Sequence, residues 1–209
     1  MKRYIKYLLL IIVIGLVAYK SVYVKRLSEM KVVTDEKFDA ATFSKKLWDE
    51  KLPAKLGGAV ELTIFISAAQ ANPADAFSKY TNALGIGNYR YAMIKTEGIV
   101  TNINEDDITL QTKMGDSLMI VKLATEFIYG NAIRDASGLV DIKDFPNTMD
   151  LNNISEELNK MVRKTVLRQF KAAVKKGDKV IVTGAIEIHK EHVKWSELEI
   201  IPVKLQIIQ

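Results

Sequence analysis

The order in which strand and helix patterns follow one another in the second half of the chain constrains the fold more than any other feature. Five segments alternate apolar and polar residues with the period of two that is typical of strands. One segment repeats apolar residues with the period of a helix and lies between the third strand and the fourth. The predicted strands are 91–103, 108–113, 117–123, 180–188 and 198–207, and the predicted helix is 154–176.

This order of three strands, a helix and two strands is that of the OB fold, a five-stranded and partly open barrel. We therefore predict an α+β protein in which residues 89–209 form an OB-like five-stranded barrel, with an inserted loop at 123–152 and the helix at 154–176. In the last strand, the alternation shifts by one residue around Pro202. Such a shift at a proline predicts a β-bulge or a sheet edge.

Residues 39–88 are predicted to form a small helical region that packs on the barrel, because three helical patterns follow one another there. The second pattern, over 59–70, is strongly apolar. The third has a clear start signal. Asn72 can cap the helix, Pro73 fits its first position, and Asp75 suits the positive end of the helix dipole.

Residues 1–26 have the features of an N-terminal membrane anchor. Their run of 13 uncharged residues is too short to span a bilayer by itself. A helix that includes the flanking residues reaches about 32 Å if Lys6 and Lys20 extend toward the headgroups. Tyr4 and Tyr19 then lie near its ends, where amphipathic rings favour the membrane interface.

We therefore predict a single-pass transmembrane helix and a tether at 27–38. A cleaved signal peptide is the alternative, since the basic start and the short apolar run also fit one. Its cleavage site would be poor, because Leu16 occupies the −3 position for cleavage after Ala18. Basic residues flank the run on both sides, so charge alone does not set the orientation.

The basic charge of the chain is confined to this N-terminal segment. The whole chain has a formal net charge of +5, but residues 1–26 contain six lysines and arginines and no acid. The remaining 183 residues hold 24 bases and 25 acids. Nucleic-acid binding by an OB domain needs a basic groove interleaved with exposed aromatic residues. We therefore expect no nucleic-acid partner.

The chain contains no cysteine, which excludes disulfides, thiolate metal sites, a cysteine nucleophile and a lipid attached to an N-terminal cysteine. Motifs for a phosphate-binding glycine loop, a nucleophile elbow or a zinc protease are also absent from the sequence. We expect no cofactor. His189, Glu191 and His192 form a weak metal-like cluster in a predicted hairpin, and a polar turn explains them at least as well.

The segment 128–136 lies in the long insertion between the third strand and the helix, where binding residues are common. Its Arg134 and Asp135 are candidate ligand contacts, and the alternative is an ion pair that holds the loop in place. A hydrolase or metal-assisted enzyme that uses this pair, or His189 and His192, is the alternative to a noncatalytic protein.

The segment Gly130-Asn131-Ala132-Ile133-Arg134-Asp135-Ala136 is the most specific motif of the chain. With several shorter motifs, it resembles the bacterial family of unknown function 2291, described as predicted periplasmic lipoproteins. The other matching residues are Trp48, Leu52-Pro53, Ala59-Val60, Asn72-Pro73, Tyr80, 91–98, Asp141, Asp144-Phe145, Asn147, Leu158-Asn159, Gly184-Ala185 and Pro202-Val203. The chain departs from the lipoprotein description because it has no cysteine to acylate.

The resemblance implies a periplasmic domain, often encoded beside carbohydrate ABC-transporter components, and it supplies no catalytic residues. ABC-transporter subunits or a periplasmic sugar-binding protein are the partners that it implies, besides the membrane. We therefore expect a noncatalytic accessory of a carbohydrate uptake system that binds a protein or a sugar. Its candidate binding residues are Gly130, Asn131, Arg134, Asp135 and Asn147.

Overall fold

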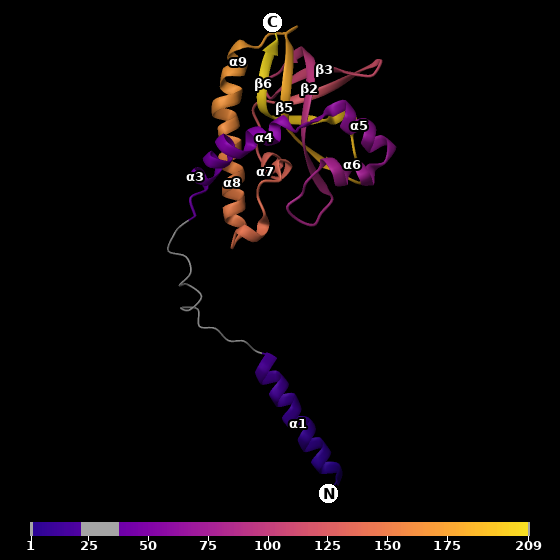
Figure 1. The fold of residues 1–209 in the computed structure, drawn as a ribbon, viewed down its shortest axis with the longest axis vertical. Coiled ribbons are helices and arrows are strands. Elements are labelled where there is room, and N and C mark those ends of the chain that lie inside the picture. Colours follow the sequence, from indigo (N-terminus) through magenta and orange to yellow (C-terminus); the bar gives the residue numbers. More distant parts are fainter. Residues whose placement is uncertain (1, 22–37, 209) are drawn as a thin grey trace. The chain divides into compact units, whose positions relative to one another are not determined.

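The computed structural model describes residues 2–21 and 38–208 (Figure 1). The chain divides into two units, 1–38 and 39–209. In the first unit, the described element is helix α1 (Lys2–Ser21). The predicted tether at 27–38 lies outside the described residues except for Phe38.

Helix α1 forms over most of the predicted anchor, but the prediction that it spans a membrane is not supported. Among the residues described, no helix combines the length and the apolar character that crossing a bilayer requires. Helix α1 is 20 residues long and includes both Lys6 and Lys20. Its uncharged run of 13 residues is shorter than the hydrocarbon core of a bilayer. Tyr4 and Tyr19 are both 80% exposed.

The second unit is built on a six-stranded sheet in which five strands pair in a closed ring. The strands are β1 (Val60–Glu61), β2 (Tyr89–Ile103), β3 (Asp107–Met114), β4 (Ser117–Ala124), β5 (Lys179–His189) and β6 (Glu199–Ile208). The pairings run β2-β3-β4-β6-β5, and β5 pairs with β2 again. The β4–β6 pairing is parallel, and the other pairings of the ring are antiparallel. All five predicted strands are confirmed in their predicted order.

Strand β1 differs from the prediction. Val60 and Glu61 fall in the predicted helix over 59–70, but they pair in parallel with Ile94 and Lys95 of β2. The reason is that β2 pairs with β3 only from Ile99 onward, so its earlier part offers an edge to another strand. Helix α5 (Leu62–Ala71) therefore begins only after this pairing.

Helices α8 and α9 lie on one side of the strands, and α5 and α6 lie on the other (Figure 1). Besides α5, the helical elements of the second unit are α3 (Ala40–Lys46), the π-helical turn η1 (Leu47–Lys51), α4 (Leu52–Gly57), α6 (Pro73–Tyr80), α7 (Ala132–Ser137), η2 (Ile142–Asp144), α8 (Thr148–Met161), the π-helical turn η3 (Val162–Leu167), α9 (Arg168–Ala173) and η4 (Trp195–Glu197). The predicted start of α6 is confirmed, because the Asn72 side chain accepts a hydrogen bond from the Asp75 backbone N–H.

The long helix begins six residues earlier than predicted, at Thr148. Asn147 rather than Asn153 is its N-cap, and the Asn147 side chain accepts a hydrogen bond from the Asp150 backbone N–H at 2.9 Å. The later start was predicted from Asn153 and Glu156, which have the spacing of a capping box, but both residues lie inside α8. The inserted loop predicted at 123–152 is therefore partly helical, since it contains α7, η2 and the first turn of α8.

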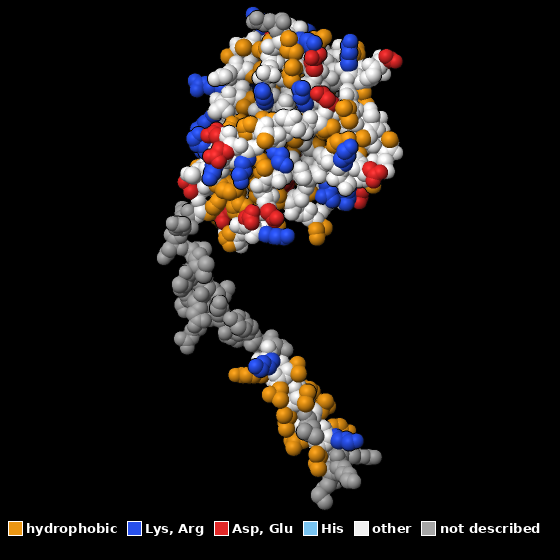
Figure 2. Space-filling model, viewed as in Figure 1, with side chains coloured by type: hydrophobic (Ala, Val, Ile, Leu, Met, Phe, Trp, Pro, Cys, Tyr) orange, Lys and Arg blue, Asp and Glu red, His pale blue; other side chains and the backbone are white. Residues whose placement is uncertain are grey.

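Apolar side chains from every strand of the ring meet in one core with residues of α5 and α9. Phe65 of α5 is fully buried, and the rings of Phe77, Tyr80 and Trp195 lie 5.9–6.4 Å from its ring centroid. This core joins the helical region to the strands. On the face that Figure 2 shows, basic and acidic side chains of the second unit are interspersed.

The irregularity predicted at Pro202 is confirmed as a bulge. Thr183 pairs with Lys204, whereas the next residue, Gly184, pairs with Pro202, so β6 carries one extra residue there. At this point the two strands approach so closely that a Cβ atom on Gly184 would lie 2.3 Å from the backbone oxygen of Ile201. Only glycine fits this position without a shift of the backbone.

We expect Gly184→Ala to lower the free energy of unfolding by about 1–3 kcal/mol, because the added methyl group overlaps backbone that cannot move independently. Chemical denaturation measures the change. Gly87→Ala is the matched control, since a Cβ atom at Gly87 meets no atom within 4 Å. Equal stability of the two variants would contradict this account of the bulge.

Candidate functional site

The inserted segment after β4 contains the predicted pair Arg134 and Asp135, and the structure buries it. All six residues of α7 are buried, and the helix packs against β2, β5 and α8. Arg134 and Asp135 are 5% and 4% exposed, and Nε of Arg134 lies 2.7 Å from Oδ1 of Asp135. Arg134 also donates through Nη1 to the Leu151 carbonyl at 2.9 Å. The ion pair lies within α7, and the hydrogen bond from Arg134 to Leu151 fixes α7 to α8, so the geometry matches a structural contact rather than a surface that a ligand contacts.

The other predicted binding residues also have structural contacts. The Gly130 carbonyl accepts a hydrogen bond from Nδ2 of Asn159 at 2.9 Å, and Oδ1 of Asn131 accepts one from Oγ of Ser155 at 3.0 Å. Asn147 caps α8. The structure therefore brings Gly130, Asn131, Arg134 and Asp135 together at α7 and α8 as parts of the scaffold.

These contacts belong to a longer row in which one long helical segment holds residues 126–131. Beyond Ser155 and Asn159, the next member is Arg163 of η3, which donates through Nη1 to the Ile128 carbonyl at 2.6 Å. Nη2 of Arg163 also binds Oε1 of Glu156 at 2.6 Å, which fixes the guanidinium. Lys171 of α9 completes the row with an ion pair of 3.1 Å to Glu126. Residues four positions apart share a helix face, so these side chains contact residues 126–131 along their whole length.

The row determines where two aromatic side chains point. Ile128 is fully buried, whereas its neighbours Phe127 and Tyr129 are 60% and 63% exposed. Their rings stack with centroids 6.3 Å apart and an interplanar angle of 30°. Exposed aromatic rings on a backbone that is tied down at its carbonyls form a candidate binding surface.

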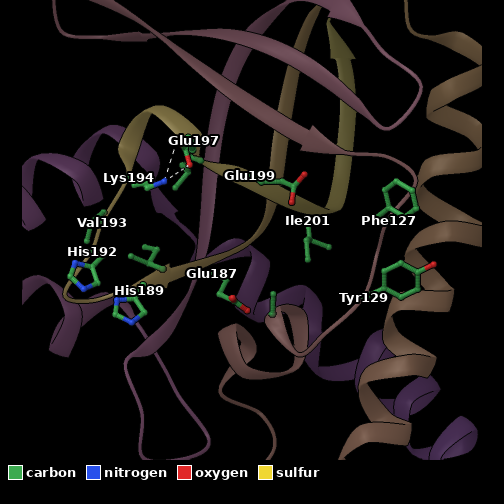
Figure 3. Close-up of a pocket in the computed structure, with 13 residues that line it drawn as sticks. Phe127, Tyr129, Glu187, His189, His192, Val193, Lys194, Glu197, Glu199 and Ile201 are labelled. Carbon is green, nitrogen blue, oxygen red and sulfur yellow. Dashed lines mark hydrogen bonds and ion pairs between the residues drawn. The ribbon is translucent and has the colours of Figure 1, made fainter.

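Phe127 and Tyr129 line a groove of about 380 Å³. In the close-up, they stand on one side, and the β5–β6 loop stands on the other, with strand residues between them (Figure 3). Apart from the two rings, the main lining residues are Glu187, Glu199 and Ile201 of β5 and β6, and His189, His192, Lys194 and Glu197 at the loop.

The groove carries more negative than positive charge. Its lining contains three glutamates and one lysine, and Nζ of Lys194 lies 3.1 Å from Oε2 of Glu197. Glu187 and Glu199 are the other two glutamates of the lining. Neither forms an ion pair within 4 Å among the described residues, since Lys122 and Lys194 bind Asp107 and Glu197. Burial raises the pKa of Glu199, and the positive charge of Lys122 partly opposes this shift.

Beside the groove, Tyr91 lies opposite Glu187 in the β2–β5 pairing. Burial, followed by the negative charges of Glu187 and Asp135, raises the pKa of Tyr91 far above its ordinary value. The phenol therefore stays protonated beside the Glu187 carboxylate. The charge of Asp135 also acts on this phenol, so Tyr91 couples the groove electrostatically to the buried pair of α7.

The predicted metal cluster is only partly assembled. The rings of His189 and His192 stack with centroids 5.0 Å apart, and the Tyr89 ring packs edge-on against His189. Glu191 is exposed and lies outside the groove lining. In the parts of the chain that the structure describes, no three His, Cys, Asp or Glu side chains are arranged to hold a metal ion. The histidines thus belong to the groove wall.

Sequence patterns did not single out Phe127, Tyr129, Glu187 or Glu199. The two rings flank Ile128 directly after a predicted strand, and this alternation could have indicated an extended segment with one exposed face. The glutamates occupy ordinary outward-facing strand positions. Only the tertiary structure brings them beside the rings.

Comparisons with known proteins connect this fold to a family and to a solved structure. The model of a family described as predicted periplasmic lipoprotein, DUF2291, matches residues 12–206. No curated protein matches the chain. The chain is similar to an OB-fold protein from Thermotoga maritima, with 27% sequence identity and a TM-score of 0.72, over 83% of this chain and 100% of that one. The predicted α+β, OB-like fold is therefore confirmed.

A second solved structure, the Stn1–Ten1 complex of S. pombe, matches with 13% identity and a TM-score of 0.27, over 63% of this chain and 68% of that one. A similarity at this level carries no argument about fold or function.

We expect Arg163→Met to loosen the segment 126–131 while the domain stays folded. A hydrogen bond from a charged group contributes about 1.5–3 kcal/mol, so its loss should raise chymotrypsin cleavage after Phe127 and Tyr129 about tenfold or more. Limited proteolysis with mass spectrometry measures the rate. The matched control is Arg168→Met, an exposed arginine in the same helical segment. Equal cleavage of both variants would show that Arg163 does not hold the segment.

Proposed function

Because the chain belongs to the DUF2291 family of predicted periplasmic lipoproteins, we propose that it is a noncatalytic extracytoplasmic protein that binds a carbohydrate. The site is the groove between residues 127–129 and the β5–β6 loop. The description of the family supports the location, and the chemistry of the groove supports the ligand class.

The observation that carries this proposal is the exposed ring pair Phe127 and Tyr129 beside the carboxylates of Glu187 and Glu199 (Figure 3). Apolar faces of sugar rings pack on aromatic rings, and sugar hydroxyls donate hydrogen bonds to carboxylates, which accept several each. A groove of about 380 Å³ has the size of a site for a small ligand. Loops of OB folds bind oligosaccharides in other proteins.

The groove supports recognition better than a reaction. A nucleophile is normally activated by a base within hydrogen-bond distance, which is itself held by a third group. Among the described residues that line the groove, the hydrogen-bonded side-chain pair is Lys194 and Glu197, which are three residues apart in the β5–β6 loop. The rings and the carboxylates of Glu187 and Glu199 instead supply stacking surfaces and acceptors.

We further propose that the protein assists a carbohydrate uptake system as an accessory, with transporter subunits or a periplasmic sugar-binding protein as partners. The support is the periplasmic description of the family together with a carbohydrate-type groove. The chain contains no cysteine, so the lipid attachment that the family description implies has no cysteine to use here.

Replacement of either ring should weaken carbohydrate binding. We expect Phe127→Ala and Tyr129→Ala each to raise the Kd for a bound saccharide about tenfold, because a central aromatic contact contributes more than about 1 kcal/mol. Calorimetric titration with a panel of hexoses, pentoses and disaccharides measures the effect. Ile86→Ala is the control, since it removes an exposed apolar side chain outside the groove. Failure of every saccharide to bind at millimolar concentration would overturn the proposal.

The accessory role predicts specific co-purification. After mild cross-linking and detergent extraction, the tagged full-length protein should recover a sugar-transporter subunit or a periplasmic sugar-binding protein, identified by mass spectrometry. The Phe127→Ala variant distinguishes capture through the bound sugar, which it would reduce, from direct protein contact, which it would leave unchanged. Repeated recovery of neither protein class would reject the accessory role.

A further inference from the structure

We propose that the ligand of the groove carries a protonated amine, so that the bound carbohydrate is an amino sugar rather than a neutral sugar. This inference rests on the proposed function and specifies its ligand class. It rests on which charged side chains of the groove have an ion-pair partner within the protein and which do not.

The lining residues hold unbalanced negative charge. Three glutamates and one lysine give a formal charge of −2 with the histidines neutral. The lysine, Lys194, is already engaged, since its Nζ lies 3.1 and 3.4 Å from the two carboxylate oxygens of Glu197. The two carboxylates that remain are Glu187 and Glu199. A ligand with a positive charge would supply what the groove lacks.

The groups around Glu199 neutralise its charge only in part. Burial raises the pKa of its carboxyl group, which means that the surroundings disfavour the ionised form. Lys122 pairs with Glu199 in the β4–β6 register, but Nζ of Lys122 also lies 3.3 Å from Oδ2 of Asp107. One lysine therefore serves two carboxylates, and the three groups together keep one net negative charge.

The protein groups beside Glu187 do not neutralise its charge. Tyr91, its partner in the β2–β5 register, stays uncharged because burial and the nearby carboxylates raise its pKa. The buried pair behind it, Arg134 and Asp135, has no net charge because the two side chains bind each other at 2.7 Å. Glu187 is exposed and lies within the groove (Figure 3). An ammonium group, with three N–H donors, would satisfy this carboxylate directly.

The aromatic wall favours a cation as well. The guanidinium carbon of Arg163 already lies 6.0 Å from the centroid of the Tyr129 ring, so this ring takes part in one cation–π contact within the protein. The stacked Phe127 ring is 60% exposed. The faces of such rings attract ammonium groups. A neutral sugar gains from stacking alone, whereas an amino sugar gains from stacking and from charge.

Calorimetric titration of the full-length protein with glucosamine, N-acetylglucosamine and glucose tests this inference. Glucosamine should bind about tenfold more tightly than the other two at low salt, and the advantage should shrink as salt screens the charges. N-acetylglucosamine is the matched probe, because acetylation removes the charge and keeps the sugar ring. Glu187→Gln and Glu199→Gln should each reduce the advantage of glucosamine about threefold or more. Glu50→Gln, an exposed acid outside the groove, should leave it unchanged.

The outcomes separate this inference from the proposed function. Equal affinities for glucosamine and N-acetylglucosamine would overturn the inference and leave carbohydrate binding in place. Methylammonium is a fourth probe, which carries the charge and the N–H donors without a sugar ring. If it binds and no sugar does, the groove prefers a cation, but the carbohydrate function fails and the amino-sugar inference fails with it. Absence of binding by all four probes would overturn both.

Discussion

The functional surface depends on the hydrogen bonds and the ion pair that fix residues 126–131 to the helical segment 155–171. Two exposed aromatic rings on a free loop would fold onto the nearest apolar surface. Here Arg163 binds the Ile128 carbonyl between the two rings, and Asn159 binds the Gly130 carbonyl just after them. In a regular α-helix, residues four positions apart differ by about 40° around the helix axis, so a row of every fourth residue drifts away from one side. The π-helical turn η3 turns less per residue and reduces this drift. Arg163 and Lys171 therefore both reach residues 126–131. A ligand then meets rings that are already in place, which lowers the entropic cost of binding.

The closed ring of strands explains why the groove lies where it does. The parallel pairing of β4 with β6 is short and joins Lys122 and Leu123 to Glu199 and Ile200. It sets the end of β4 beside the start of β6, so the first residues of β6, Glu199 and Ile201 among them, lie between the segment that leaves β4 and the loop that enters β6. The bulge at Pro202 lets β6 pair with β5 as well, and Gly184 allows the close approach that this requires. The walls of the groove are thus consequences of strand register.

The sequence predicted correctly those features that depend on residues close together along the chain. The five strands, the Asn72 cap and the bulge at Pro202 each depend on residues close together in sequence, and all are confirmed. Strand β1 could not be predicted, because its formation depends on a free edge of β2 far along the chain. The long helix held two possible caps, and sequence alone did not select Asn147. The groove was missed because its two walls and its glutamates meet only through the tertiary structure.

The motif centred on Arg134 and Asp135 illustrates how structural and functional charges differ. It is the most specific motif of the chain, yet its side chains neutralise each other and are buried, as a scaffold contact requires. Glu187 and Glu199 belong to no such local motif, but they stand in a groove without an ion-pair partner of their own among the described residues. Burial disfavours the ionised form of Glu199, so the protein gains no stability from leaving this carboxylate with only a shared cation. The imbalance therefore points to a positive charge that arrives with a ligand, and the scaffold motif serves by holding α7 behind that site.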